Sequence, residues 1–284
     1  MIKKVLLVGG SGYLGTAISK VFEGNIEFDL TLGDLFEPKI TTQKFIKFDV
    51  IDKAVVNSFI QEYDVIINCT GQITKPINTC FNINTTGIAN IVDAVQTYQR
   101  KIIHISTVSV YGTCDYADEM SLLNPESPYA ASKAFAEYQI NRSLQKNRYC
   151  ILRLANLYGE EQPKGLFSYL LRASTTREKL YFNNDGTLKR HFIHVNDAAN
   201  AVFIAVKKNL EGTFNVASDD NFTVNQILTF IENASKTTFE IEFEKIKPIE
   251  NIDKLNCTLF KKECGFKAEE NIKNFIKKIF KANE

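Results

Sequence analysis

Short runs of β-branched and other apolar residues alternate with segments of helical period through the first half of the chain. Six runs are typical of buried strands: 5–8, 28–32, 44–48, 65–69, 102–106 and 150–154. Between most of them the apolar residues recur every three or four positions, as over 83–98. Strands that alternate with helices form parallel sheets covered on both faces. The pattern therefore predicts a doubly wound parallel α/β fold.

The pattern changes after about Gly159, where strands and helices no longer alternate. It predicts a helix over 166–172, a turn over 183–186, a helix over 198–206 capped by Asn196 and Asp197, a strand over 239–243 and a helix over 271–280. This mixture indicates a smaller, C-terminal α+β cap. We expect a large domain of 1–159 plus 191–217 and a cap of 160–190 plus 218–284.

The composition is that of an ordinary globular protein, with 44% of the 284 residues hydrophobic and 24% charged. A net charge of +1 gives no electrostatic reason to expect nucleic acid or an anionic membrane as partner. The six cysteines form no C-x-x-C pair and there are only three histidines, so we expect free thiols and no metal site. We see no signal peptide and no apolar run of membrane-spanning length, and expect a cytoplasmic protein.

A glycine-rich loop directly follows the first predicted strand and opens a helix. Its glycines stand at positions 9, 12 and 15 of Gly9-Gly10-Ser11-Gly12-Tyr13-Leu14-Gly15. Without side chains the backbone turns tightly and approaches a pyrophosphate, while the helix N-terminus offers free N–H groups and a positive dipole end. The loop therefore predicts a dinucleotide site, although a glycine turn between strand and helix also serves packing alone.

An acidic residue, Asp34, ends the second predicted strand about 20 positions after the loop. A carboxylate there binds both ribose hydroxyls of an adenosine and repels a 2′-phosphate. Leu35 follows it, not an arginine, so we expect NAD in preference to NADP, with Lys39 or Lys44 as alternative sources of positive charge. A simple turn-forming role for Asp34 beside Gly33 is the competing interpretation.

Tyr129 and Lys133 are four residues apart in a predicted helix, and side chains at this spacing lie on the same face. An ammonium group beside a phenol favours the phenolate, so we expect the pKa of Tyr129 to be lowered. The pair is then a candidate acid/base. Tyrosine and lysine at this spacing also occur by chance on solvated helices, and the surrounding motifs decide between the two readings.

Several further motifs follow in a fixed order along the chain. They are 68–71 (Asn-Cys-Thr-Gly), 84–87 (Asn-Thr-Thr-Gly), 106–112, 153–159, 190–197 and 212–216. Together with the glycine loop and the Tyr129/Lys133 pair, they resemble the extended short-chain dehydrogenase/reductases, specifically the NAD-dependent nucleotide-sugar epimerase/dehydratase family. The resemblance covers most of the chain. It implies a Rossmann-type dinucleotide-binding domain and a cap that binds a nucleotide-diphosphate sugar.

The resemblance also implies three catalytic residues. Tyr129 would take or give the proton of a sugar hydroxyl as hydride moves to or from the nicotinamide, and Lys133 would lower its pKa and hold the nicotinamide ribose. Thr107 would orient the substrate oxygen. The choice of Thr107 over Ser106 or Ser109 depends on the family's spacing alone.

The implied binding residues form a larger set. Those for NAD are Gly9, Ser11, Gly12, Tyr13, Leu14, Gly15, Asp34, Asp49, Val50, Cys69, Thr70, Gly71, Tyr129 and Lys133. Asp49 and Val50 would lie near the adenine. Substrate would contact Thr107, Asn156 and Arg190, the last two at its diphosphate, for which a guanidinium is suited. Asn156 is equally readable as a structural turn residue, and Arg190 as a surface arginine.

Dehydratases of this family carry an Asp-Glu pair directly after the catalytic threonine, where this chain has Val108 and Ser109. We therefore disfavour a dehydratase. A 4-epimerase that retains NAD is slightly preferred, and a 4-ketoreductase that exchanges NAD(P)H is the main alternative. A decarboxylase is a distant third, and a non-catalytic dinucleotide-binding regulator stays open. The helices from Asn84 and Tyr129 resemble those that pair in family dimers, so we expect a homodimer.

Overall fold

Seven parallel strands form the central sheet of a computed structural model, which describes residues 2–39, 41–71, 75–244, 246 and 249–281. The strand order is β11-β7-β5-β4-β1-β2-β3. The strands are β1 (Lys3–Val8), β2 (Phe28–Asp34), β3 (Lys44–Lys47), β4 (Val65–Asn68), β5 (Lys101–Thr107), β7 (Tyr149–Leu154) and β11 (Gly212–Val216). Six match the predicted runs, and β11 adds a seventh. Because all run the same way, their carboxyl ends meet at one edge.

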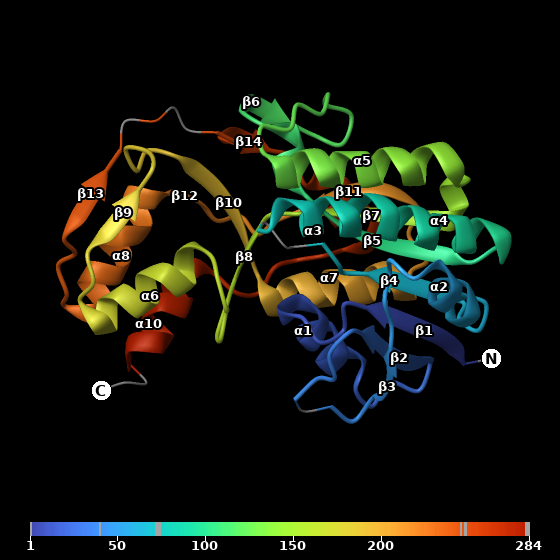
Figure 1. The fold of residues 1–284 in the computed structure, drawn as a ribbon. Helices are drawn as coiled ribbons and strands as arrows, with labels where there is room; N and C mark the ends of the chain where they lie inside the picture. The colour runs from blue at the N-terminus through green and yellow to red at the C-terminus, as the bar shows by residue number, and fades with distance from the viewer. Residues whose placement is uncertain (1, 40, 72–74, 245, 247–248, 282–284) are drawn as a thin grey trace.

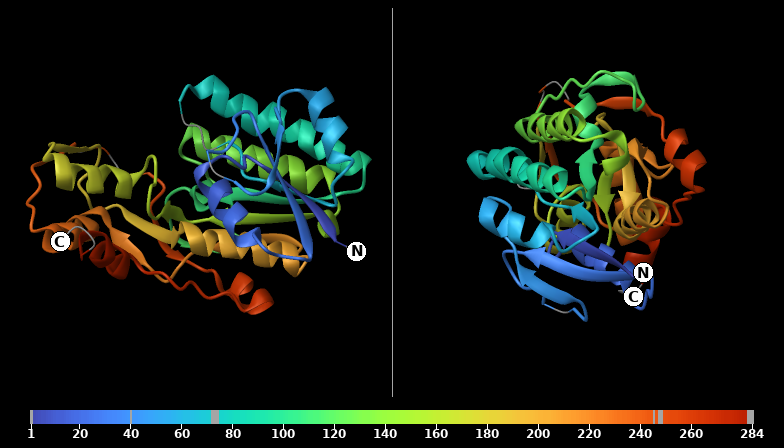
Figure 2. Two further views of the ribbon diagram at one scale, coloured as in Figure 1. Left: turned by 90° about the horizontal axis from the view of Figure 1, so that it is seen from below. Right: turned by 90° about the vertical axis from the view of Figure 1, so that its right-hand side faces the viewer.

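Helices cover both faces of this sheet, as Figures 1 and 2 show. One face carries α1 (Tyr13–Phe22) and α7 (Val195–Lys207), and the other carries α2 (Lys53–Ile60), α4 (Ile88–Thr97) and α5 (Pro128–Ser143). Successive residues of one strand enter opposite cores. Ile66 of β4 packs with the second helix set and Ile67 with the first. Burial on both faces explains the continuous apolar runs and confirms the doubly wound fold.

The helix expected over 83–98 is longer and contains a wider turn. Three helical segments follow one another, α3 (Ile77–Asn82), the π-helical turn η1 (Ile83–Gly87) and α4. Within the π turn the buried Asn84 amide donates to the carbonyls of Gly71 (3.0 Å) and Cys80 (3.1 Å). Through Asn84 the π turn therefore holds Gly71, in the segment that follows β4. The apolar periodicity of the sequence predicts a regular helix and gives no sign of such a turn.

The start of α7 differs from the prediction. The cap is His194, whose Nδ1 accepts from the Asn196 N–H at 3.3 Å, and not Asn196 or Asp197. The buried Asp197 carboxylate instead accepts from the backbone N–H groups of Glu269 and Glu270, both at 3.1 Å. The prediction was wrong because Asp197 is used by a segment that is distant in sequence.

A smaller α+β part adjoins the carboxyl edge of the sheet (Figure 1). It contains a three-stranded sheet in the order β12-β10-β8, a strand pair β13-β9 and three helices. These elements are β8 (Asn156–Tyr158), α6 (Leu166–Thr176), β9 (Leu180–Phe182), β10 (Lys189–His194), β12 (Asn221–Thr223), α8 (Val224–Ser235), β13 (Ile241–Phe243) and α10 (Ile272–Lys281). Aromatic side chains, among them Tyr158, Phe167, Phe192 and Phe275, fill its separate core.

One C-terminal segment leaves this smaller part and packs on the large core. Here β14 (Ile252–Leu255) pairs with β6 (Cys114–Ala117), and α9 (Thr258–Cys264) follows. Ile252, Phe260 and Phe266 belong to the core cluster beneath the central sheet. The sequence-based division into two domains stays a prediction, and from this packing we propose that 252–266 go with the large domain.

None of the described helices is long and apolar enough to cross a membrane. Within the same residues, no group of three or more His, Cys, Asp or Glu side chains is arranged to hold a metal ion. The described cysteines carry free thiols, three of them buried.

Candidate active site

A cleft of about 1060 Å³ lies at the carboxyl edge of the sheet, between the sheet and the smaller part. All but one of the residues expected to bind cofactor or substrate line it. They are Gly9, Gly12, Tyr13, Leu14, Gly15, Asp34, Asp49, Val50, Cys69, Thr70, Gly71, Thr107, Tyr129, Lys133, Asn156 and Arg190. The exception is Ser11, whose side chain turns away to donate to the Phe36 carbonyl at 2.5 Å. Residues far apart in sequence thus share one cavity.

The glycine loop has the geometry of a phosphate cradle. Gly9 has a φ of +83°, which glycine adopts without strain, and a Cβ on Gly15 would lie 2.2 Å from the Gly9 carbonyl oxygen. The following helix α1 begins at Tyr13 with Gly12 as its N-cap and no side-chain cap. Its first N–H groups are therefore available to a ligand in the cleft, and the loop fits a dinucleotide pyrophosphate.

Asp34 stands at the end of β2 with its carboxylate fixed on the cleft wall. Its Oδ2 accepts from the Ser11 N–H at 3.1 Å and its Oδ1 from the Leu35 N–H at 2.7 Å. These bonds tie the carboxylate to the glycine loop as well as to its own turn. A negative charge held there suits ribose hydroxyls and disfavours a 2′-phosphate.

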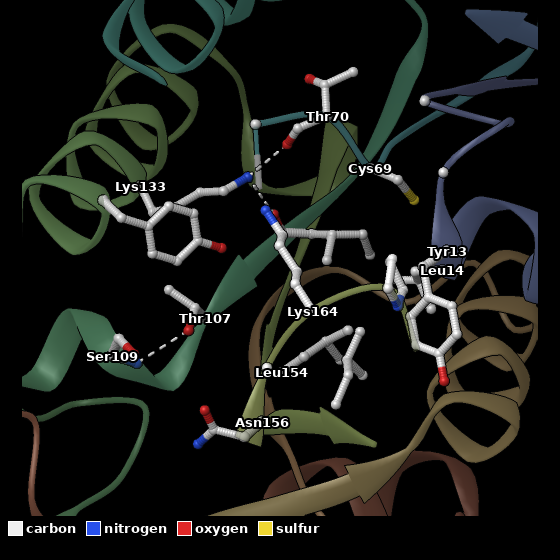
Figure 3. A pocket seen from close by; sticks show the side chains of 18 of the residues that line it. Tyr13, Leu14, Cys69, Thr70, Thr107, Ser109, Lys133, Leu154, Asn156 and Lys164 are labelled. Carbon is white, nitrogen blue, oxygen red and sulfur yellow. Dashed lines mark hydrogen bonds between the residues drawn. The ribbon is translucent and has the colours of Figure 1, made fainter. Parts of the chain in front are cut away.

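Lys133 is buried at the opposite wall, one turn along α5 from Tyr129. Its Nζ donates to the carbonyls of Thr70 at 2.8 Å and Ile105 at 3.0 Å, joining the ends of β4 and β5 (Figure 3). Burial lowers the pKa of Lys133 to about 8, although nearby Cys69, Cys80 and Glu137 oppose that change. The ammonium is thus positioned by backbone carbonyls, and it loses its proton at a lower pH than an exposed lysine does.

Tyr129 lies in the first turn of α5, half-buried against the cleft. Ser127 caps the helix by accepting from the Ala130 N–H at 3.2 Å, and Pro128 begins it. Burial raises the pKa of Tyr129, and Cys80 and Glu250 raise it further. The expected lowering was therefore wrong for this structure: the loss of water raises the pKa, and the Lys133 ammonium, bonded to two carbonyls, does not offset that rise.

Thr107 ends β5 and caps the short 3₁₀ helix η2 (Val108–Tyr111). Its Oγ1 accepts from the Ser109 N–H at 3.2 Å, which leaves the hydroxyl hydrogen for a group in the cleft (Figure 3). The neighbouring Ser106 is buried, and its hydroxyl donates to Glu137. The geometry therefore favours Thr107 over Ser106 as the hydroxyl that meets a ligand.

A buried network behind the cleft connects α5 with the central sheet. The Arg153 guanidinium on β7 donates to both Glu137 oxygens, at 2.6 Å from Nη2 and 3.1 Å from Nε, and to the Tyr111 hydroxyl at 2.6 Å. Tyr111 then donates to Asn215 on β11 at 2.7 Å. Because Glu137 is one turn from Lys133 and also accepts from Ser106, this network holds the helix that carries Tyr129 in place.

The far end of the cleft contains the two residues expected at the substrate's diphosphate. Arg190 on β10 donates from Nη1 to the Glu250 carbonyl at 2.5 Å, and that nitrogen lies 3.8 Å from the Glu250 carboxylate. Burial lowers the pKa of Arg190, partly offset by Glu250. The exposed Asn156 on β8 donates to the His191 carbonyl at 3.1 Å. These two polar side chains thus line the cleft among apolar ones of the smaller part, such as Phe182, Leu188 and Phe192.

Several cleft residues had no signal in the sequence. They include Phe36 beside Asp34, the segment 162–167 with Lys164 (Figure 3), Phe182, Asn184, Leu188 and Glu250. Most come from loops and short strands of the smaller part, where no periodicity or motif marks the side chains that turn inward. The exception is Asn184, which lies in the turn that the sequence predicts over 183–186.

Fold and cleft together define an α/β protein with a dinucleotide-type loop in a cleft that continues to the smaller part. The model of the NAD dependent epimerase/dehydratase family matches residues 5–217. The chain therefore belongs to that family, which confirms the family predicted from its motifs.

Individual relatives agree with this assignment. The chain is 29% identical, over 97% of its length and 96% of the relative's, to a Methanocaldococcus jannaschii protein provisionally named as a UDP-glucose 4-epimerase. It is similar in structure to Thermus thermophilus UDP-glucose 4-epimerase in complex with NAD (TM-score 0.85, 21% identity, 99% and 100% coverage). Bacillus cereus UDP-glucuronic acid 4-epimerase in complex with UDP-glucuronic acid and NAD is equally similar (TM-score 0.86, 21% identity, 99% and 100% coverage). At these identities the solved structures establish the fold.

Proposed function

We propose that this protein is an NAD-dependent oxidoreductase of nucleotide-diphosphate sugars that acts at C4 of the sugar as a 4-epimerase. The observation that carries the proposal is the continuity of one cleft from the glycine loop and Asp34, past Thr107, Tyr129 and Lys133, to Arg190. Such a cleft brings a dinucleotide and a second phosphorylated ligand to the same phenol. The family and the NAD in the names of its solved relatives support this cofactor.

The residues for NAD follow the cleft wall. The loop 9–15 and the start of α1 would bind the pyrophosphate, and Asp34 the adenosine ribose. Asp49 and Val50 would lie by the adenine, with Cys69, Thr70 and Gly71 further along the wall. Bound NAD supplies the acceptor and donor of hydride, and the chain's own groups handle the proton.

Tyr129 would exchange that proton with the sugar oxygen. Because burial keeps its pKa high, the phenol holds its proton at neutral pH, and it needs a nearby cation to exist as the phenolate that takes a proton from a sugar hydroxyl. Lys133, one helical turn away, would supply that charge, and Thr107 would donate to the same sugar oxygen. Arg190, with Asn156, would hold the diphosphate so that the sugar faces Tyr129.

A dehydratase requires an additional acid and base next to Thr107. The first of those positions is the buried apolar Val108 and the second is Ser109, which has no titratable group at neutral pH. The loss of two such groups removes about 10² to 10⁴ in rate for each. Hydride transfer coupled to a single proton transfer is what the cleft supports.

The test is to purify the protein, denature it and measure the NAD released, then incubate the native protein with UDP-glucose, UDP-N-acetylglucosamine and dTDP-glucose. We expect about one NAD per chain and formation of the C4 epimer of one substrate, detected by NMR. An empty protein that consumes added NAD(P)H with a 4-keto-sugar would identify a 4-ketoreductase instead. Tyr129→Phe should retain NAD and lose turnover, and unchanged turnover would refute the catalytic role of Tyr129.

We propose a homodimer that pairs through the helices from Asn84 and from Tyr129, together with α3, which directly precedes Asn84. Phe135 and Tyr138 of α5 are 39% and 62% exposed, and Ile77 and Phe81 of α3 add apolar area. Exposed apolar patches of this kind are typical of protein interfaces. Light scattering of the purified protein should give twice the chain mass. We also propose a cytoplasmic location, because free thiols are typical of proteins in reducing compartments.

A further inference from the structure

His104 is a buried imidazole on β5 that the proposed mechanism does not use. It pairs in register with Asn68, the last residue of β4, and the two residues are 1% and 2% exposed. Ile102 and Ile66, two positions earlier on the same strands, belong to the core under α4 and α5. Because strand side chains alternate between faces, His104 and Asn68 also point to the face that α5 covers. Two polar side chains in this apolar core require an explanation.

The hydrogen bonds of Asn68 determine which way its amide faces. Its Oδ1 accepts from the Thr70 N–H at 3.1 Å and from the Thr70 hydroxyl at 2.7 Å. Because a backbone N–H can only donate, the amide oxygen must face Thr70, and Nδ2 then donates to His104 Nδ1 at 3.2 Å. The imidazole is therefore neutral, with its hydrogen on Nε2. Burial and the charge of Lys133 agree with this state, since both lower the pKa of His104.

These bonds continue to the proposed catalytic lysine. The Thr70 carbonyl accepts from Lys133 Nζ at 2.8 Å (Figure 3), and the second carbonyl on that nitrogen belongs to Ile105, the residue after His104. If the imidazole acceptor were lost, the Asn68 amide would keep an unpaired Nδ2 or turn it toward the Thr70 N–H, where two donors would meet. The acceptor on His104 thus holds the amide, and the amide holds Thr70.

The imidazole has a cost in stability. Its Nε2 has no hydrogen-bond partner among the residues that the structure describes. A buried N–H without a partner destabilises the folded state, whereas an apolar side chain of similar size packs in a core without that loss. Residues that reduce stability in this way are typical of sites where activity requires them. The cost therefore favours a functional role for His104 over a packing role.

We propose that His104 is a positioning residue, which acts through Asn68 and Thr70 to hold the Lys133 ammonium in place beside NAD and Tyr129. This inference rests on the proposed function of Lys133. The imidazole supplies a hydrogen-bond acceptor and takes no proton during the reaction. Any side chain with an acceptor at the same place should therefore replace it, and an apolar side chain of the same shape should not.

The experiment compares two replacements of equal shape, His104→Asn and His104→Leu. The Oδ1 of asparagine is bonded to Cγ, as the imidazole Nδ1 is, and can accept from Asn68, whereas leucine offers no acceptor. Circular dichroism gives the melting temperature of each variant. Fluorescence titration gives the affinity for NAD and for ADP, which we expect to reach only the glycine loop and Asp34. The rate is measured as kcat with the nucleotide-sugar that the wild type epimerises.

In His104→Leu we expect NAD affinity and kcat to fall at least about tenfold, because a small displacement of a catalytic group has an effect of that size. Its ADP affinity should be unchanged, and its melting temperature should equal or exceed that of His104→Asn. In His104→Asn, NAD affinity and kcat should stay within about twofold of the wild type. Wild-type values in His104→Leu would overturn the inference, and so would equal losses in both variants or a lower melting temperature for His104→Leu than for His104→Asn.

A double variant tests the route through Asn68. Adding His104→Leu to Asn68→Leu should cause no further loss of NAD affinity, because the bond between the two side chains is already absent. Additive losses would contradict the route.

The two readouts separate this inference from the proposed function. If NAD affinity follows the expected pattern but no nucleotide-sugar is epimerised, the proposed reaction fails and the inference holds. If a nucleotide-sugar is epimerised, and neither NAD affinity nor kcat depends on an acceptor at His104, the inference alone fails.

Discussion

Replacing Glu137 by Gln tests whether the buried network behind the cleft holds the catalytic helix. The Glu137 and Arg153 side chains are only 1% and 6% exposed, so water hardly reaches this ion pair. The substitution leaves the Arg153 guanidinium buried without a counter-charge. It also weakens the bonds that connect α5 to Ser106 on β5 and to Arg153 on β7.

The size of the effect follows from burial. Breaking a buried ion pair by removing one partner costs about 3 to 5 kcal/mol, because an uncompensated charge remains inside. Two unit charges about 4 Å apart at an effective dielectric constant of 20 give a similar ~4 kcal/mol. For a chain of this size we expect the melting temperature to fall by roughly 5 to 15 °C.

Thermal unfolding followed by circular dichroism measures this change. The matched control is Glu178→Gln, which breaks the Arg172–Glu178 pair whose side chains are 58% and 38% exposed. There we expect a loss of about 1 kcal/mol or less, since water replaces the partner. Equal shifts in the two variants would refute the assignment of a desolvated, stabilising pair at Arg153.

A second measurement separates positioning from general stability. The negative charge of Glu137 raises the pKa of Lys133, which burial holds at about 8. Removing that charge lowers the pKa further, so Lys133 loses its proton at a lower pH. Because the proposed role of Lys133 needs the ammonium form, kcat/KM of Glu137→Gln should decline with rising pH earlier than in the wild type. A profile that keeps its alkaline limb unchanged would contradict this coupling.

Two further predictions concern the cofactor. Gly15→Ala places a Cβ 2.2 Å from the Gly9 carbonyl oxygen, so the loop must shift; we expect NAD affinity to fall at least about tenfold in a fluorescence titration, and wild-type affinity would disprove the close approach. Asp34→Asn removes the charge that faces the adenosine ribose and should raise NADP affinity relative to NAD about tenfold. Asp29→Asn, on an exposed position of the same strand, is its control and should change neither affinity.

Local features of the sequence were sufficient for the large sheet and the cofactor half of the cleft. The runs 5–8 and 65–69 were recognisable because a strand buried on both faces must be apolar at every position. The glycine loop and Asp34 were recognisable because each follows a strand directly. Because the carboxyl ends of parallel strands meet at one edge of the sheet, the predicted fold already places these residues together.

The errors came from quantities that depend on the surroundings. The Tyr129/Lys133 pair was found from helical spacing, but the direction of the Tyr129 pKa depends on burial, which no spacing encodes. The capping residue of α7 was misassigned because Asp197 is used by backbone from 269–270. In both cases a neighbour distant in sequence outweighed the local rule.

The sequence by itself determined the class of fold, the family, the dinucleotide loop and the phenol–ammonium pair, because each is written in residues that are close together in the chain. Only the tertiary structure decided that Glu250 contacts Arg190 and Ser127 at the cleft wall, and that Glu137 and Arg153 form a buried pair. Burial and electric charge act through space, and Arg190 and Glu250, which meet in this cleft, are 60 residues apart in the chain.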